Sequence, residues 1–466
     1  MLRLPNSVLW IGLTFGVLLV FVTPPFQAAD EDSHFKHAYA LSRGSFFAEQ
    51  NAEGRLGYFF PAEFAAFEEA HRYMKGKTDA KYSFEKLHHW SLMSWMTDDR
   101  ALFLPLWYSS AHAHPLLYCP QAIGVVVGRL LGNLFGNRSP LTLMHWGRLV
   151  NLICFWLLVY AAIKITPVAK SFIAVLAFMP MTFSLASSLI YDAPIIGVSL
   201  ITIALLCRYA FSPEVARITK RDVLLCCLVS VVLAEMKSVY LPLFLLWFMI
   251  PRTKFSSRWA QFCSFFAILA CGLGEYFVWR LVESRSWALP VVSEEVAFFK
   301  PQAYFIFAHP VSYLKILLNS IYEGRLFYLL SFIGSLGWLD THLPFAFIGL
   351  YCLVLLGVAT AGDDWQPRIM FWQRLCLLVG FFAIAAIIFT VTYIIWTSQP
   401  GVGGIGSLRI EGVQGRYLIP IAMLPDAALA GGLKICVPET LRVAGIAGVG
   451  VASAGLTILI TMMRYY

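Results

Sequence analysis

The chain has 466 residues, of which 59% are hydrophobic and 13% are charged, and its mean hydropathy is +0.70. A soluble domain carries roughly 25% charged residues, so this composition excludes a soluble protein. The formal net charge is +8, but the Lys and Arg residues are scattered through short loops, which argues against a nucleic-acid partner. The sequence therefore predicts an all-α polytopic membrane protein with a single integral-membrane domain over residues 1–466.

The first apolar segment covers residues 7–22 and ends at a pair of prolines, with Arg3 before it. A secretory signal peptide would begin in a similar way. However, Gln27 stands where a small residue is wanted for cleavage near Ala29, and the apolar segment is long for a signal peptide. We therefore interpret this segment as a membrane span that starts in the cytoplasm.

Three carboxylates and two histidines follow the first span, in the stretch from Asp30 to Tyr39. Charged groups close to hydrocarbon are unfavourable and tend to mark sites of chemistry or transport. A solvated acidic loop is the alternative interpretation, and position alone does not decide between the two.

Residues 24–147 are expected to form a first extracytoplasmic loop. Its residues 30–115 are polar and rich in aromatic residues, with helical periodicity over residues 61–74 and 84–95. Such helices would lie on the membrane surface. Three of its histidines are expected to be surface residues, namely His71, His88 and His89.

Basic residues predict the topology, because cytoplasmic loops carry an excess of Lys and Arg. Their alternation along the chain predicts about eleven crossings and a second extracytoplasmic region over residues 283–342. Residues 116–135 are apolar enough to cross, but a crossing there would place nearly every later basic cluster outside. We therefore expect an interfacial helix at residues 116–135, and another at residues 327–338. Between residues 222 and 250, two short helices are expected to meet at residues 235–238 near the outer leaflet.

Seven short blocks of sequence carry a resemblance to a known family. They are Asp30-Glu31 with His34-Phe35, Pro115 to Gln121, Gly147-Arg148-Leu149 with Asn151, Ser188 to Ala193, Lys237 with Tyr240, Leu336 to Thr341, and Gly412 to Tyr417 with Pro420. In this order the blocks resemble a bacterial membrane-protein family named domain of unknown function 2142, which is grouped with the GT-C superfamily of polyprenyl-phosphate-dependent glycosyltransferases. The chain departs from the family pattern in a longer segment before Asp30 and in a single proline after His114.

The resemblance implies a GT-C-like fold with a large first extracytoplasmic loop of interfacial helices. It also implies a location in the bacterial inner (cytoplasmic) membrane, with the active site facing the periplasm. Membrane lipids are expected partners.

Glycosyl transfer to a hydroxyl requires a base for the acceptor proton and a polar clamp for the departing phosphate. In GT-C enzymes the base is usually an acidic residue in the first outer loop. Asp30 fits by position and by motif, Glu31 is the alternative, and His34 is expected to orient the base.

Two basic residues are expected on the outer side, against the charge rule. Arg416 follows a glycine-rich loop and Lys237 stands at the turn between two short helices, with Tyr240 in the same block. Arg suits phosphate through its planar fork of donors, so Arg416, Lys237 and Tyr240 are candidates for binding the donor phosphate. For an outer-facing Arg, the alternative is an interaction with lipid headgroups.

Asp192, His114 and Asp340 are candidates for binding the acceptor or a metal ion. For Asp192, which precedes an apolar helix, a helix cap is an equal alternative. The cofactor is not determined, although a divalent cation (Mg or Mn) is compatible with this chemistry. The glycines over residues 401–415 do not form a nucleotide-binding loop, because no strand precedes them.

The sequence thus predicts a GT-C-type glycosyltransferase that moves a sugar from a polyprenyl-phosphate donor to a cell-surface glycan, glycolipid or protein acceptor. A polymerase or ligase of lipid-linked oligosaccharide is the first alternative, and a transporter or flippase of polysaccharide or lipid is the second. Transporters need charged groups within their spans and often carry internal repeats. Here the candidates gather at the outer ends of the predicted spans, which favours surface chemistry.

Overall fold

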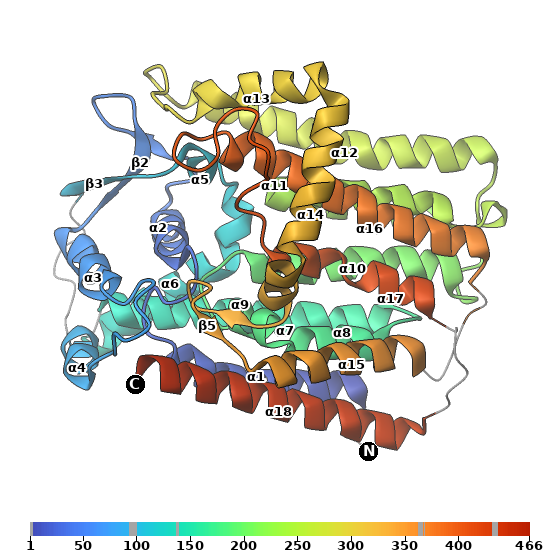
Figure 1. Ribbon diagram of the computed structural model, residues 1–466, viewed down its shortest axis with the longest axis horizontal. Coiled ribbons are helices and arrows are strands. Elements are labelled where there is room, and N and C mark those ends of the chain that lie inside the picture. Colours follow the sequence, from blue (N-terminus) through green and yellow to red (C-terminus); the bar gives the residue numbers. More distant parts are fainter. Residues whose placement is uncertain (1–2, 93–99, 137–138, 362–366, 368, 431–436) are drawn as a thin grey trace.

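The apolar segments fold into long helices, because a helix satisfies its own backbone hydrogen bonds and hydrocarbon offers no other partner. The computed structural model describes residues 3–92, 100–136, 139–361, 367, 369–430 and 437–466. Its long helices lie side by side along a common direction (Figure 1). They are α1 (Leu4–Val22), α7 (Pro140–Ile165), α10 (Asp192–Phe211), α11 (Lys220–Lys237), α12 (Arg258–Arg285), α15 (Phe345–Ala361), α16 (Phe371–Thr392) and α18 (Glu439–Tyr465).

This arrangement confirms an all-α polytopic membrane protein. Nine helical stretches of the described residues are long and apolar enough to cross a membrane, and Phe345–Thr360 is a shorter apolar helix. These stretches include residues 115–135 and 310–333, which we expected to lie wholly or partly in the interface. The count of about eleven crossings stays a prediction.

Several apolar stretches are broken into shorter helices at proline or at a turn. Residues 170–186 form two helices, α8 (Lys170–Phe178) and α9 (Pro180–Ala186), because Pro180 cannot continue the helix before it. The 3₁₀ helix η2 (Ser238–Met249) follows α11, and η5 (Gly415–Ile421) precedes α17 (Met423–Leu429).

The predicted reversal of the chain at residues 235–238 is confirmed. Lys237 has an extended backbone between α11 and η2. The amide of Ile218 donates to the carbonyl of Lys254 over 2.8 Å, so the two ends of this hairpin lie together. Lys237 therefore stands at the tip of the hairpin.

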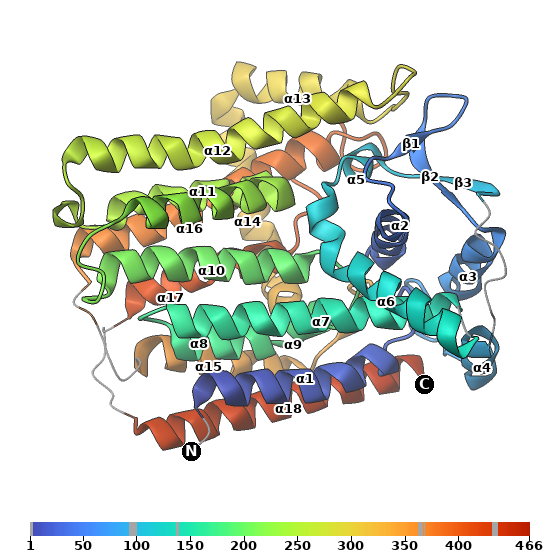
Figure 2. The same cartoon turned by 180° about the vertical axis from the view of Figure 1, so that it is seen from behind.

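A separate layer caps one end of the bundle, on the left in Figure 1 and on the right in Figure 2. It contains a small antiparallel sheet and short helices, and we call this end the α2–α5 end. Its elements are α2 (Glu31–Ser42), β1 (Glu49–Gln50), β2 (Leu56–Phe60), α3 (Ala62–Arg72), α4 (Phe84–Leu92), β3 (Leu102–Pro105) and α5 (Tyr108–Ala111). The sheet order is β1-β2-β3, with Gly57 opposite Pro105. The sheet was not predicted, and of the predicted helix over residues 84–95 the last three residues lie outside the described ones.

The region over residues 283–342, which we predicted to be extracytoplasmic, adjoins the α2–α5 end through Trp287 and Glu295. It contains α13 (Val296–Ala308) and α14 (Pro310–Ile333), followed by a hairpin of β4 (Ser335–Leu336) and β5 (Thr341–His342). In both views α14 runs across the direction of the bundle helices. The helix expected over residues 327–338 is therefore only the last part of α14, and the strand and turn begin after Ile333.

The helix α6 (Cys119–Phe135), which continues from η1 (Pro115–Tyr118), packs on the first half of α7. Two glycines allow this close approach. A Cβ atom on Gly124 would lie 2.2 Å from the carbonyl oxygen of Trp146, and one on Gly128 would lie 2.9 Å from the Trp146 ring. Any larger residue at these two positions would push α6 away from α7.

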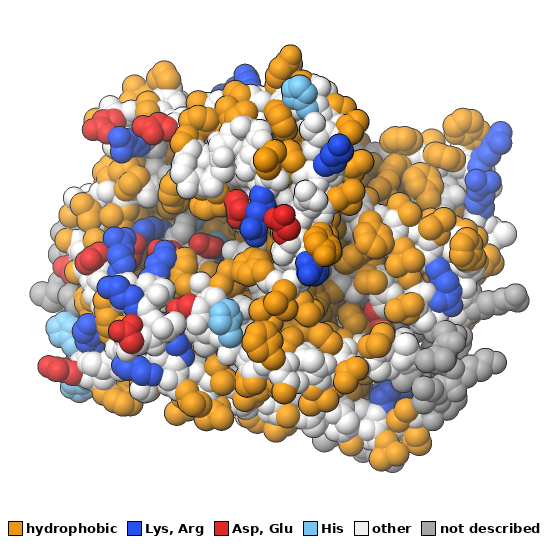
Figure 3. Space-filling model, viewed as in Figure 1, with side chains coloured by type: hydrophobic (Ala, Val, Ile, Leu, Met, Phe, Trp, Pro, Cys, Tyr) orange, Lys and Arg blue, Asp and Glu red, His pale blue; other side chains and the backbone are white. Residues whose placement is uncertain are grey.

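Charge is distributed unevenly over the surface, as Figure 3 shows. Most acidic side chains lie over the half formed by the α2–α5 end, while the rest of this face is largely hydrophobic with a few basic groups at the far edge. A surface of this kind is expected for a bundle embedded in lipid with one polar end.

The capping layer has its own core, built from stacked aromatic rings. The rings of Phe35 and Phe60 both stack on the ring of Phe64, with centroid distances of 5.1 and 4.4 Å. His71 is part of this core and is fully buried, so its prediction as a surface residue is wrong. Its Nε2 lies in hydrogen-bond contact with the hydroxyl of Tyr82 at 3.1 Å, and its Nδ1 with the carbonyl oxygen of Phe67 at 2.7 Å. His88 and His89 are exposed, as expected.

Burial lowers the pKa of His71 from its ordinary value of 6.5 to about 4. The unfolded chain therefore binds a proton at His71 below pH 6.5, whereas the folded chain does not until about pH 4. We expect the free energy of unfolding to decrease as the pH falls through this window. Thermal unfolding in nanodiscs should show a smaller pH dependence for His71→Gln than for wild type. The exposed His89 provides the control, since His89→Gln should leave the dependence unchanged, and an equal effect of both variants would contradict this role.

Candidate functional site

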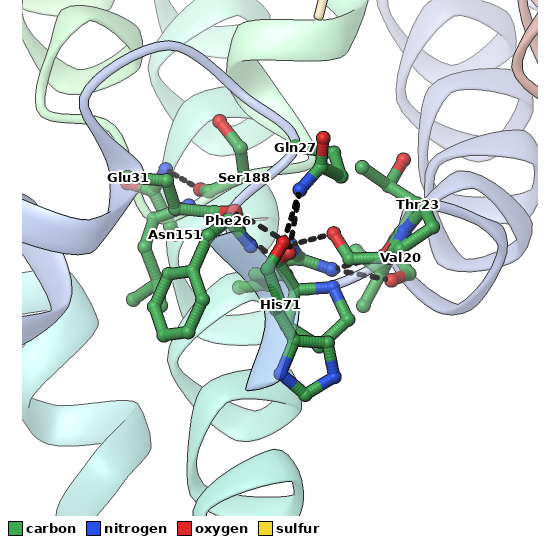
Figure 4. Close-up of polar contacts among 12 residues, drawn as sticks. Val20, Thr23, Phe26, Gln27, Glu31, His71, Asn151 and Ser188 are labelled. Carbon is green, nitrogen blue, oxygen red and sulfur yellow. Dashed lines mark hydrogen bonds and ion pairs between the residues drawn. The ribbon is translucent and has the colours of Figure 1, made fainter. Parts of the chain in front are cut away.

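A buried ion pair holds the chain where it leaves the first helix. Arg148 of α7 is fully buried, and its Nε and Nη2 donate to the two carboxylate oxygens of Glu31 over 2.8 and 2.6 Å. The remaining donors of Arg148 reach three backbone carbonyls at the end of α1, those of Val20, Thr23 and Pro24. In Figure 4, Glu31, Val20 and Thr23 lie around one point.

Glu31 receives two further hydrogen bonds. The amides of Phe26 and Leu189 donate to its carboxylate over 3.1 and 2.9 Å. With four donors and no exposed surface, this carboxylate cannot reach an acceptor hydroxyl. The structure therefore argues against Glu31 as the proton acceptor and places it in a structural ion pair.

Asp30, by contrast, points out of this pair. Its backbone is left-handed (φ 65°), a conformation that Asp tolerates better than most residues, and it stands directly before α2. The turn directs Glu31 into the protein while 54% of the Asp30 side chain stays exposed. The two neighbouring carboxylates thus occupy opposite environments.

Arg416 joins Asp30 to a second acid from another helix. Its Nη2 lies 3.1 Å from Asp30 Oδ2, and its Nε lies 3.5 Å from Asp192 Oδ2. The Arg416 side chain is only 5% exposed and that of Asp192 is 12% exposed. Three segments that are far apart in sequence, the start of α2, the start of α10 and η5, therefore meet at one charged cluster.

Lys237 adds a second cation beside this cluster. Its Nζ lies 4.5 Å from the centre of the Tyr417 ring and 5.8 Å from that of Tyr191. Within the described ranges, no carboxylate oxygen lies within 4.0 Å of this ammonium. Tyr240 donates to the carbonyl of Tyr417 over 2.7 Å, so its hydroxyl supports the backbone next to Arg416 and is not free to bind phosphate as a donor.

His34 lies behind the cluster. Its Nδ1 is 3.0 Å from the hydroxyl of Tyr118, and its ring meets the Tyr191 ring edge-on at 4.5 Å. Burial lowers the pKa of His34, against the opposing effect of Asp30 and Asp192. Its side chain bonds Tyr118 and makes no hydrogen bond with Asp30 among the described atoms, so a direct orienting role has no support in the geometry.

The other two candidates lie elsewhere. Asp340 bonds Arg464 at the end of α18 over 3.1 Å and caps its own turn through the amide of Trp338. Its carboxylate thus fastens the last helix to the β4–β5 hairpin. His114 belongs to a different group of side chains, with its Nε2 at 3.6 Å from Glu235. The predicted site residues therefore occupy three places at the same end of the bundle.

The tyrosines around the cluster were not among the predicted site residues. Tyr118, Tyr191 and Tyr417 form its aromatic walls. All three stand inside the sequence blocks that carry the family resemblance, which was the only signal that could have identified them.

A cleft with a volume of about 720 Å³ opens at the same end of the bundle. It is bounded by the segment after β3, the segment before α13 and the loop after residue 396. Trp107 and Trp396 line it, with ring centroids 6.3 Å apart. The cleft also borders Glu294, Glu295 and Gln399, so it offers apolar rings together with hydrogen-bonding groups. This combination suits a ligand that has both apolar faces and hydroxyl groups.

In the predicted topology, this cleft faces the outer side of the membrane. A cysteine that replaces exposed Glu294 should react with an impermeant maleimide in intact spheroplasts, whereas one that replaces exposed Lys220 should react only after permeabilisation. The exposed native thiols Cys263 and Cys271 would be replaced by Ala beforehand. Labelling of the Lys220 position but not of the Glu294 position in intact cells would reverse the predicted orientation.

Comparison with known proteins identifies the family. A family model described as a predicted membrane protein (DUF2142) matches residues 13–425. No curated protein and no solved structure matches the chain. The matched region includes Asp30, Asp192 and Arg416 together with the buried pair of Glu31 and Arg148. The chain therefore belongs to the DUF2142 family of predicted membrane proteins.

Proposed function

We propose that this protein is a glycosyltransferase that takes a sugar from a polyprenyl-phosphate donor in the bacterial inner membrane and transfers it to a glycan, glycolipid or protein on the periplasmic side. One observation carries the proposal. A half-exposed carboxylate, Asp30, lies 3.1 Å from a buried Arg416 and beside Lys237, an ammonium without a carboxylate partner among the described residues.

The chemistry needs one group for a proton and others for negative charge. The acceptor oxygen bonds the anomeric carbon of the sugar, and its proton passes to the carboxylate of Asp30. The bond between the anomeric carbon and the phosphate oxygen breaks, and the electron pair leaves with the polyprenyl phosphate. Arg416 and Lys237 stabilise the charge that develops on that phosphate.

Asp192 keeps Arg416 in place during this step. Its carboxylate lies against the Nε edge of the guanidinium, which leaves the Nη groups directed at Asp30 and at an incoming phosphate. The two carboxylates and the two cations cancel in charge before the reaction. When Asp30 takes up the acceptor proton, the cluster gains one positive charge, which offsets the negative charge that develops on the departing phosphate. The cleft lined by Trp107 and Trp396 is where we place the acceptor.

A polymerase or ligase of lipid-linked oligosaccharide would use the same groups. A divalent cation between Asp30 and Asp192 is disfavoured, because Arg416 already bridges their two carboxylates. The polymerase or ligase alternative leaves the roles of Asp30 and Arg416 unchanged.

Asp30→Asn keeps the shape of the side chain and removes its basicity. We expect insertion and donor binding to stay near wild type while transfer decreases by about 100-fold or more, as removal of a positioned base usually does. Donor binding would be measured with synthetic polyprenyl-phosphate hexoses in nanodiscs, and transfer by the surface-glycan profile of a strain in which the variant is the only copy.

Asp32→Asn is the matched control for Asp30→Asn, because Asp32 lies two residues further along and, among the described residues, its carboxylate bonds only the adjacent amide of Ser33. Asp32→Asn should transfer normally. Glu31→Gln should instead reduce the yield of folded protein, since it leaves Arg148 buried without its charge partner. A full glycan profile with Asp30→Asn would remove Asp30 from the mechanism.

Arg416→Lys keeps the positive charge and loses the fork of donors. We expect weaker donor binding by about 10-fold or more, because a single ammonium cannot contact phosphate and both acids together. The measurement is the dissociation constant for polyprenyl phosphate and its hexose conjugate in nanodiscs. Arg409→Lys, at an exposed residue that pairs with Glu411, should bind like wild type. Unchanged binding by both Arg416→Lys and Arg416→Ala would place the phosphate elsewhere.

A further inference from the structure

Three potential metal ligands converge outside the charged cluster. His114 lies just before η1, Glu235 on the last turn of α11, and Glu275 on α12. One ligand atom of each lies within 4.8 Å of the others. We propose that these three side chains bind a divalent first-row metal ion, with the chemistry of Zn²⁺ or Mn²⁺, which cross-links the two helices to the segment before η1.

The first argument is an unsatisfied buried acid. Glu235 is only 4% exposed, and neither of its carboxylate oxygens has a hydrogen bond among the described atoms. Oε2 of Glu275 is also buried without a hydrogen bond. Two carboxylates that face each other between apolar helices must share a proton or bind a cation, because an uncompensated buried charge is strongly unfavourable.

Neighbouring cations do not supply that charge. Arg280, one turn further along α12, donates to Glu283 over 2.8 Å and to the carbonyl of His112 over 2.7 Å. Lys237 stands two residues after Glu235 but lies against the rings of Tyr191 and Tyr417. The Trp279 ring covers His114 at 4.1 Å and limits the access of water. Among the described residues, no Lys or Arg nitrogen lies within 4.0 Å of either acid, so a bound cation is the charge partner that we propose.

The ligand set selects the kind of metal. One imidazole nitrogen with two carboxylates suits Zn²⁺ or Mn²⁺, whereas Mg²⁺ prefers oxygen ligands and keeps several waters. His114 Nδ1 accepts a hydrogen bond from the amide of Leu116 over 3.0 Å, and this bond directs Nε2 at Glu235. Coordination through Nε2 moves the ring proton to Nδ1. The hydrogen bond from the Leu116 amide is then lost, and a metal–nitrogen bond takes its place.

Such a metal would also hold the end of α11 from which Lys237 projects. The inference does not depend on the proposed transferase, because metal binding can be measured without donor or acceptor. Loss of the metal would then show first as a loss of stability and not as a change in chemistry.

The test uses the full chain in nanodiscs, stripped with EDTA and passed through a desalting column. Zn²⁺ binding would be measured by titration with elemental analysis, and Mn²⁺ binding by electron paramagnetic resonance, because Mn²⁺ discriminates against the thiols of the chain. We expect one ion per chain and a higher unfolding temperature with metal. Glu235→Gln and Glu275→Gln should each weaken binding by at least about 10-fold, since even groups that only support metal ligands contribute that much.

Glu283→Gln is the matched control, because Glu283 is a buried acid on the same helix whose carboxylate is already paired with Arg280 and His112. It should bind metal like wild type. His114→Gln provides a third ligand variant in case a Glu variant does not fold, which circular dichroism would show. The proposal is overturned if wild type binds neither ion, or if all ligand variants bind as wild type does. If wild type binds neither ion, a proton shared by the carboxyl groups of Glu235 and Glu275 explains why the two acids lie together.

Discussion

The buried pair of Glu31 and Arg148 is the interaction on which the rest of this structure depends. It fastens the end of α1 to α7 and, through the amide of Leu189, to the segment before α10. Removing one partner of such a pair typically costs about 3–5 kcal/mol, because the other charge stays buried. Here the cost is compounded, since Arg148 also satisfies three carbonyls that would otherwise lack partners at the end of α1.

The position of Asp30 is a consequence of this pair. Because Glu31 must point inward, the preceding residue turns through a left-handed conformation and presents its carboxylate on the outside. The first turn of α2 thus separates two chemically identical groups into a structural acid and a reactive candidate. Two adjacent acids thus have different roles: Glu31 holds the start of α2 against α7, and Asp30 presents its carboxylate at the charged cluster.

Another buried arginine at the α2–α5 end also bonds several backbone carbonyls and one carboxylate. Arg464 at the end of α18 donates to the carbonyls of Met74, Lys77 and Ala80 and pairs with Asp340. The planar guanidinium has five donors, so one buried side chain can satisfy several backbone groups at once. Arg148, Arg416 and Arg464 therefore explain why basic residues occur at the end of the bundle where the charge rule predicts few. Two of them hold the structure together, and only Arg416 lies beside an exposed acid and an unpaired ammonium.

The sequence by itself determined the polytopic class, the family, the reversal of the chain near residue 237 and the identity of the residues that form the charged cluster. These follow from hydropathy, from the positions of basic residues and from short motifs, all of which are local properties. Only the tertiary structure decided which of two neighbouring acids is buried, because that depends on Arg148, which is 117 residues away. It also decided that His71 is a core residue and that Asp340 fastens α18, since both depend on contacts with distant segments. The three-stranded sheet was beyond prediction for the same reason, because β1 has two residues and β3 pairs with β2 across a long intervening segment.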